Sequence, residues 1–354
     1  MKKICLTLSL GLSLMFFSGC GGESTPAGTA KENLAPPETI EATTSSEQTY
    51  AEKLGWEKGT RALILHVDDA GMSHDSNVGT WRALDEGAAN SVSIMMPCPW
   101  VPEFAKYVRE NPEVDAGLHL TLTSEWDYLR WPPLAGKPVV PGLVDEQGCL
   151  WDNVPLVIKN ASADEVEIEI RAQLDRARHL GFEPTHMDSH MGTLFADPAF
   201  LERYIKVGIE EQIPVMFPGG HNTLIGAEGT GMDAEVIKAV GQKIWDGGLP
   251  VLDDLHANSY SWKQEDKVDD YIGVIRSIQP GVTMIILHCT QTFQNFEVIS
   301  DSATLRRGDL LAMLDPRIKE VIEEEGIVMT TFRELKQRRD AVKPAVAEPV
   351  STQE

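Results

Sequence analysis

The feature that most constrains the fold is a set of eight short apolar segments, separated by stretches with helical spacing or helix-capping residues. Strands and helices that alternate along a chain form a parallel sheet covered by helices. Eight such units favour an α/β fold in which the sheet curls into an irregular (β/α) barrel. An open, doubly wound sheet is the alternative. The predicted strands are residues 62–67, 91–96, 115–120, 185–188, 214–217, 250–255, 283–287 and 327–331.

Capping residues mark the ends of several predicted helices. Ser162 and Glu165 have the spacing of a capping box, and the helix that they begin is expected to end near Gly181. Asp197-Pro198 and Asp315-Pro316 each place a capping carboxylate before a proline at the first helical position. These signals agree with the strand pattern, because each predicted helix lies between two predicted strands.

Residues 1–20 have the pattern of an export signal rather than of a folded segment. Two lysines precede an apolar run that is short for a bilayer span, and small residues stand directly before Cys20. The pattern resembles a bacterial lipoprotein signal, in which Cys20 is lipidated; an ordinary secretory signal is the alternative. We therefore expect a protein of the bacterial cell envelope that is attached to the membrane only through its lipid.

The remaining composition divides the chain into three parts. Residues 21–55 are rich in Ser, Thr, Pro, Ala and Glu, so we predict a flexible linker there. Residues 56–340 are predicted to form the catalytic domain, and residues 341–354 a disordered tail. A net charge of −23 argues against nucleic acid as a partner, because phosphate backbones require a basic surface. The oligomeric state is left open.

Acidic and imidazole side chains follow several of the predicted strands. Asp68 and Asp69 end the first strand, and Gly71 permits a turn that brings both to one edge. His119, His190 and His288 stand at the ends of later strands. Each residue alone is explained as well by a turn or by the core. Together they suggest a site, because the carboxyl ends of barrel strands converge on one mouth.

The residue types in this set are those of metal-assisted hydrolysis. Two imidazoles and one carboxylate with an open position make a metal site suited to Lewis-acid catalysis. A second carboxylate beside the metal can take a proton from water, and a separate imidazole can donate one to the leaving group. The set therefore predicts hydrolysis of an amide or an ester.

Three segments of the sequence resemble the motifs of the YdjC-like carbohydrate deacetylases. They are Asp68-Asp-Ala-Gly71, Gly117-Leu-His-Leu-Thr-Leu-Thr123 and Thr185-His-Met-Asp-Ser-His190, and their order matches that of the family. The resemblance implies an irregular (β/α) barrel like that of polysaccharide deacetylases. It also implies removal of acetyl groups from N-acetylated saccharides with one divalent metal ion, zinc or magnesium. Two histidines and one aspartate favour zinc-like ions.

Carried over by position, the resemblance implies a role for each residue of the set. Asp69, His119 and His190 would bind the metal. Asp68 would act as the base, and His288 as the acid.

Other residues are expected around this centre. The resemblance places His186 and Asp188 against the substrate or in support of the metal ligands, with a structural role for His186 as the alternative. The long connection over residues 124–161 contains Trp126 and Trp131, which we expect to stack on sugar rings. The alternative for this connection is a lid that packs its own small core. Arg306 and Arg307 are expected on a helix surface or the barrel rim, unless one orients a catalytic acid.

The sequence also departs from the family pattern. The family usually has Asn-Ala before the paired acids, where this chain has His66-Val67, and His-Pro-Gly where this chain has His288-Cys289-Thr290. The direction of the His66 side chain decides whether it acts on Asp68 or only packs. These changes keep two alternatives open: a metal-dependent esterase or phosphoesterase, and a glycan-binding lipoprotein without catalysis.

Overall fold

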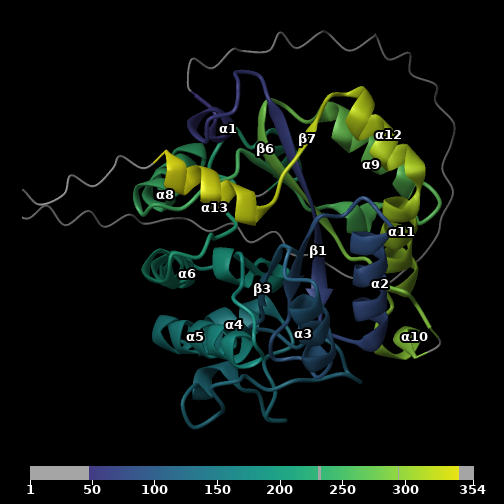
Figure 1. Ribbon diagram of the computed structural model, residues 1–354. Helices are drawn as coiled ribbons and strands as arrows, with labels where there is room; N and C mark the ends of the chain where they lie inside the picture. The colour runs from purple at the N-terminus through teal and green to yellow at the C-terminus, as the bar shows by residue number, and fades with distance from the viewer. Residues whose placement is uncertain (1–47, 230–232, 294, 343–354) are drawn as a thin grey trace, which may run out of the picture. The chain divides into compact units, whose positions relative to one another are not determined.

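The computed structural model of the protein describes residues 48–229, 233–293 and 295–342 (Figure 1). The predicted signal, most of the predicted linker and nearly all of the predicted tail lie outside these residues. A parallel sheet forms the centre of the described part, in the order β4-β3-β2-β1-β6-β5, and β7 pairs with the beginning of β1. Its strands are β1 (Arg61–Ala70), β2 (Ser91–Ile94), β3 (Ala116–Leu120), β4 (Met187–Ser189), β5 (Asp254–His256), β6 (Gly281–Leu287) and β7 (Val328–Met329).

Two isolated parallel bridges complete the curl of this sheet. Met187 of β4 pairs with Val215, and Pro218 pairs with Leu252, just before β5. The segment predicted as the fifth strand therefore links the two edges of the sheet without forming a regular strand. The irregular (β/α) barrel is confirmed, and the open sheet is excluded by this closure.

Helices surround the sheet, and Figure 1 shows α2 beside α11 and α5 beside α6. The α-helices are α1 (Tyr50–Lys53), α2 (His74–Asp85), α3 (Val101–Glu110), α4 (Val154–Asn160), α5 (Ala163–His179), α6 (Pro198–Glu211), α7 (Thr223–Ala227), α8 (Ala234–Asp246), α9 (Lys267–Ser277), α10 (Phe296–Ile299), α11 (Ala303–Leu314), α12 (Pro316–Glu324) and α13 (Phe332–Ala341). Short 3₁₀ helices are η1 (Pro141–Leu143), η2 (His190–Phe195) and η3 (Ser259–Ser261). No helix in the described ranges combines the length and the apolar character needed to cross a membrane.

The predicted helix caps are confirmed. The Ser162 side chain accepts from the Glu165 amide, and the Glu165 side chain accepts from the Ser162 amide, which completes the capping box of α5. Asp197 and Asp315 cap α6 and α12, each directly before the predicted proline. These local signals are reliable because each one satisfies amide groups that the first helical turn leaves without a partner.

The end of the predicted linker is wrong. Thr49 caps α1, and the amides of Tyr50 and Ala51 donate to the buried Asp253 carboxylate at 2.8 and 3.1 Å. Tyr50, Ala51 and Leu54 are buried against the domain. The folded domain therefore begins at Thr49 or earlier. Composition did not indicate this, because the anchor is a carboxylate about two hundred residues away.

The long connection over residues 124–161 packs largely on itself. Trp131 is 1% exposed and donates its indole N–H to the Thr123 carbonyl at 2.9 Å. The buried Glu169 carboxylate of α5 accepts from the amides of Leu134 and Ala135 at 3.0 and 2.9 Å. The predicted stacking of Trp131 on a sugar is wrong, because its ring fills the small core of the connection.

Candidate metal and catalytic site

Asp68 and Asp69 lie together at the carboxyl end of β1, both almost fully buried. Asp69 has a φ of 68°, a left-handed conformation that is uncommon for a residue with a side chain. Gly71 follows with a φ of 84°. Asp69 lies inside β1, at an irregularity of the strand between Val67 and Ala70 and two residues before Gly71, and this left-handed residue brings both carboxylates to the barrel mouth. Backbone strain of this kind clusters at functional sites.

Asp69, His119 and His190 form a compact ligand set. One ligand atom from each lies within 4.8 Å of those from the other two. The Asp69 Oδ1 atom is buried, lies 3.3 Å from His119 Nε2, and makes no hydrogen bond within the described part of the chain. A buried carboxylate oxygen without a donor, beside two imidazoles, has the donor set of a divalent metal site. The residues present therefore fit the metal that the motifs imply.

The electric field at this point also favours a cation. Burial by itself lowers the pKa of His119, but Asp68 and Asp188 raise it well above its usual value. The carboxylates around His119 thus stabilise positive charge at the position where a metal ion would lie.

Arg306 holds the other oxygen of Asp69. Its guanidinium donates from Nη1 to Asp69 Oδ2 at 2.5 Å, and the residue is only 4% exposed. Burial alone would raise the pKa of Asp69, but the charge on Arg306 and the neighbouring His119 ring hold it well below its usual range. Trp126 and Tyr260 each place a ring about 5.5 Å from the guanidinium carbon. Arg306 therefore keeps Asp69 ionised, and Trp126 lies at the site through this contact.

Asp188 orients the ring of His119 through a hydrogen bond to its Nδ1 atom. Its Oδ1 accepts from His119 Nδ1 at 2.6 Å, which leaves His119 Nε2 directed at the Asp69 side. Burial raises the pKa of Asp188, but His119 and His66 lower it to well below its usual value. With 1% exposure, Asp188 supports a ligand. Of the two roles expected for Asp188, these contacts favour support of a metal ligand over contact with substrate.

His66 points inward from β1, which resolves the question that the sequence left open. Its Nε2 lies 2.9 Å from Asp188 Oδ2 and 3.3 Å from Asp68 Oδ1. Burial by itself lowers the pKa of His66, but these two carboxylates raise it to about 9. His66 therefore contacts both the candidate base and the carboxylate that orients His119.

His190 has partners that were not predicted. Its Nδ1 lies 3.0 Å from Thr123 Oγ1, and its Nε2 lies 3.1 Å from Glu125 Oε1. Thr123 ends the second motif and Glu125 follows two residues later, so proximity to that motif was the signal available in the sequence. The second motif thus supplies His119 and also the residues around His190.

His288 lies across the mouth from His66. Its Nε2 is 3.9 Å from Asp68 Oδ2, and its amide donates to Asp309 Oδ2 at 3.0 Å. Tyr260 packs edge-on against its ring, with 4.6 Å between centroids. Burial lowers the pKa of His288 to about 4, and the charge on Arg306 acts in the same direction. The ring is therefore neutral near pH 7, and it lies next to the candidate base.

His186 does not reach the mouth. It is fully buried and stacks on Phe332 at 4.1 Å, and burial, the largest of several causes, lowers its pKa to about 4. Its Nδ1 lies 2.9 Å from Thr185 Oγ1. These contacts place His186 in the core, away from the substrate side that was expected, and they favour the structural alternative.

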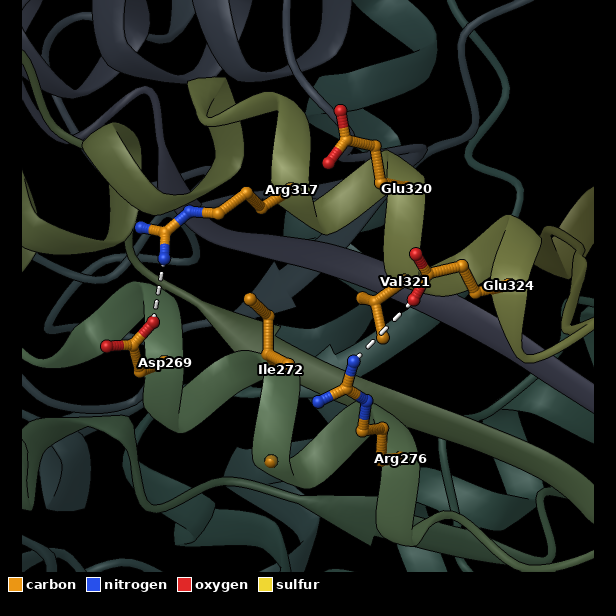
Figure 2. Close-up of a pocket in the computed structure, with 8 residues that line it drawn as sticks. Asp269, Ile272, Arg276, Arg317, Glu320, Val321 and Glu324 are labelled. Carbon is orange, nitrogen blue, oxygen red and sulfur yellow. Dashed lines mark hydrogen bonds and ion pairs between the residues drawn. The ribbon is translucent and has the colours of Figure 1, made fainter.

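A surface groove of about 480 Å³ lies elsewhere, between α9 and α12. Figure 2 shows that charged side chains line it, with Arg317 paired to Asp269 at 2.8 Å and Arg276 to Glu324 at 3.6 Å. Its lining residues include none of the paired acids or ligand histidines. This groove is therefore separate from the residues at the barrel mouth.

Comparison with known proteins identifies the family of the chain. The model of the family of YdjC-like proteins matches residues 62–324, which include every residue of the mouth described above. The chain belongs to the YdjC-like family. A carbohydrate deacetylase of Thermus thermophilus is 29% identical over 266 residues, covering 75% of this chain and 91% of that protein. One of Thermoanaerobacter pseudethanolicus is 26% identical over 274 residues, covering 77% of this chain and 99% of that protein.

A solved structure has the same fold. A protein of Enterococcus faecalis named for cellobiose-phosphate cleavage superposes with a TM-score of 0.65 at 22% identity. The match covers 78% of this chain and 99% of that one. The two proteins thus share the fold of the barrel.

Proposed function

We propose that this YdjC-like protein is a metal-dependent deacetylase that hydrolyses the acetamide group of an N-acetylated sugar or short oligosaccharide. The observation that carries the proposal is the grouping of Asp69, His119 and His190 within 4.8 Å, beside a second carboxylate, Asp68. The relatives named above, both carbohydrate deacetylases, support the substrate class.

Asp69, His119 and His190 are the residues that would hold the metal. A divalent ion bound there supplies Lewis acidity, which polarises a carbonyl and lowers the pKa of water. The chain itself supplies the charge balance: Arg306 neutralises one oxygen of Asp69, and Asp188 fixes the tautomer of His119. Asp69 and His119 are thereby oriented before any substrate binds, and Thr123 and Glu125 contact the ring of His190.

Asp68 is the group that takes the proton from the attacking water. It is not part of the ligand set, and its Oδ2 lies 3.7 Å from His119 Nε2 and 3.9 Å from His288 Nε2. It therefore lies between the metal ligands and the candidate acid. General-base catalysis requires this proximity to the reacting water.

His288 gives a proton to the departing amine. Because the imidazole is neutral near pH 7 in the resting protein, it must gain this proton during the reaction. Asp68 Oδ2, 3.9 Å away, is the neighbouring group that acquires one when water attacks. The proton thus passes from the water to Asp68 and through His288 to the nitrogen that leaves.

Acetate release tests the proposal. The metal-loaded protein is expected to release acetate from N-acetylated chito-oligosaccharides, to lose this activity with a chelator, and to regain it with Zn²⁺ or Mg²⁺. Parallel O-acetyl and phosphoester substrates separate deacetylation of amides from the esterase and phosphoesterase alternatives. Saccharide binding without release of acetate from any substrate would instead support the non-catalytic alternative.

We also propose that the mature protein is tethered to the cell envelope through a lipid on Cys20. The support is the sequence pattern of residues 1–20, which lie outside the described residues. In a bacterial host, the full chain is expected in the membrane fraction and Cys20→Ser in a soluble or unprocessed form. Equal membrane attachment of the two proteins would contradict the anchor.

A further inference from the structure

The hydrogen bonds of His66 fix more than its direction. His66 lies on β1 two residues before Asp68, so both side chains point to the same face of the strand. It is fully buried, and both ring nitrogens have close polar neighbours. Nε2 faces Asp188 Oδ2 at 2.9 Å and Asp68 Oδ1 at 3.3 Å, while Nδ1 lies 2.9 Å from Ser91 Oγ.

Counting hydrogens assigns the charge of this ring. Asp188 is an ionised acceptor, so Nε2 must carry a hydrogen. The Ser91 hydroxyl donates its only hydrogen to Asp115 Oδ2 at 2.7 Å. The Asp115 carboxylate is an acceptor in this bond, since it also accepts hydrogen bonds from the backbone amides of Phe332 and Arg333, at 3.0 and 2.9 Å. Ser91 Oγ must therefore accept from His66, which places a hydrogen on Nδ1 as well.

We propose that His66 is a permanently charged positioning residue, an imidazolium held between the carboxylates of Asp68 and Asp188. It binds Asp68 through Oδ1, which leaves Oδ2 on the side of His119 and His288. Through Asp188 it also holds the ring of His119, since the two oxygens of Asp188 contact one imidazole each. The asparagine usual at this position in the family offers hydrogen bonds without the charge.

The positive charge on His66 offsets the negative charge of buried carboxylates in this chain. Asp68, Asp69 and Asp188 bring three carboxylates close together in a buried site, and Arg306 pairs only with Asp69. Buried carboxylates require counter-charges, since their desolvation is costly. His66 supplies a positive charge to the two carboxylates that Arg306 does not contact, Asp68 and Asp188.

The first test reads the protonation of His66 directly and needs no substrate. Nitrogen-15 NMR of the metal-free protein is expected to show both ring nitrogens of His66 protonated at neutral pH, with His66→Asn identifying the signals by their loss. A neutral ring with one bare nitrogen would overturn the proposal, whether or not the protein is a deacetylase.

The second test rests on the proposed function and measures what the charge does. His66→Asn is expected to lower Zn²⁺ affinity or kcat by about 10–100-fold, as for other groups that orient metal ligands. The acidic limb of its kcat/KM profile is expected to move to higher pH, because the carboxylates lose a positive neighbour and bind protons more readily.

A matched variant separates charge from packing. Ser93 donates to the same oxygen of Asp68, at 3.4 Å, but is neutral. Ser93→Ala is expected to leave the acidic limb in place, even where kcat falls. An unshifted limb in His66→Asn, with Zn²⁺ affinity and kcat equal to wild type, would overturn the role in positioning. If the wild type releases no acetate at all, the NMR result and the Zn²⁺ titration still decide the charge and its effect on the ligands.

Discussion

The two sides of the barrel mouth differ in how completely their polar atoms are paired. On the side of β3 and β4, both nitrogens of His66 and both oxygens of Asp188 have partners between 2.6 and 2.9 Å. On the side facing the opening, Asp69 Oδ1, Glu125 Oε2 and His288 Nδ1 are buried and make no hydrogen bond with any described residue.

This difference separates the residues that hold other side chains in place, here called the supporting side, from those proposed to contact a metal ion or substrate, here called the acting side. Buried polar atoms are nearly always paired in folded proteins, so each exception requires an explanation. On the supporting side His66 and Asp188 are fully paired and hold one another in place, and His186 Nε2 beside them is the atom left without a partner among the described residues. On the acting side three buried atoms remain without a partner among the described residues, and for Asp69 Oδ1, within the proposed ligand set, a bound metal ion would supply one. The predictions below test this division.

The largest effect is expected from Asp69, the residue that belongs to both sides. Asp69→Ala removes a ligand and leaves the buried Arg306 without its carboxylate. We expect the affinity for Zn²⁺ to fall further than it does when a group that only orients a ligand is lost, which costs about 10–100-fold. Isothermal titration calorimetry with Zn²⁺ measures this affinity. Wild-type affinity in this variant would show that the ligand set is wrong.

Asp68→Asn is expected to separate binding from turnover. Asparagine keeps the size of the side chain but cannot accept a proton, so Zn²⁺ affinity should remain near that of wild type. Acetate release should fall by about 10²–10⁴-fold, the usual contribution of a general base. Measurement of metal affinity and kcat on the same preparation provides the check. Full activity in Asp68→Asn would contradict the assignment of the base.

Asp188→Asn tests the supporting side. The change removes the charge that fixes His119 and leaves His66 with one carboxylate instead of two. We expect Zn²⁺ affinity to fall by about 10–100-fold, less than for Asp69→Ala. An effect as large as that of Asp69→Ala would mean that Asp188 binds the metal itself, as one alternative grouping of Asp68, His119 and Asp188 allows.

The sequence predicted the acting side better than the supporting side. The convergence of parallel strands was enough to group five residues that stand in the last residues of a strand or directly after it: Asp68, Asp69, His119, His190 and His288. Arg306 was harder to assign, because it lies on α11 and reaches Asp69 across 237 residues. The roles of His66 and Asp188 depend on which way strand residues point and on atoms paired across β1, β3 and β4. Trp131 was misassigned because an aromatic ring in a long connection serves a core as readily as a ligand.

The smallest effect is expected far from the mouth, in the groove between α9 and α12. Arg276 is 55% exposed on its side chain and pairs with Glu324 at 3.6 Å. Exposed pairs of this kind contribute less than about 1 kcal/mol, because water and salt screen them. Arg276→Ala is therefore expected to change neither Zn²⁺ affinity nor acetate release, and to shift thermal unfolding only slightly. A loss of activity in this variant would place a functional site on the outer helices and break the assignment of the chemistry to the mouth alone.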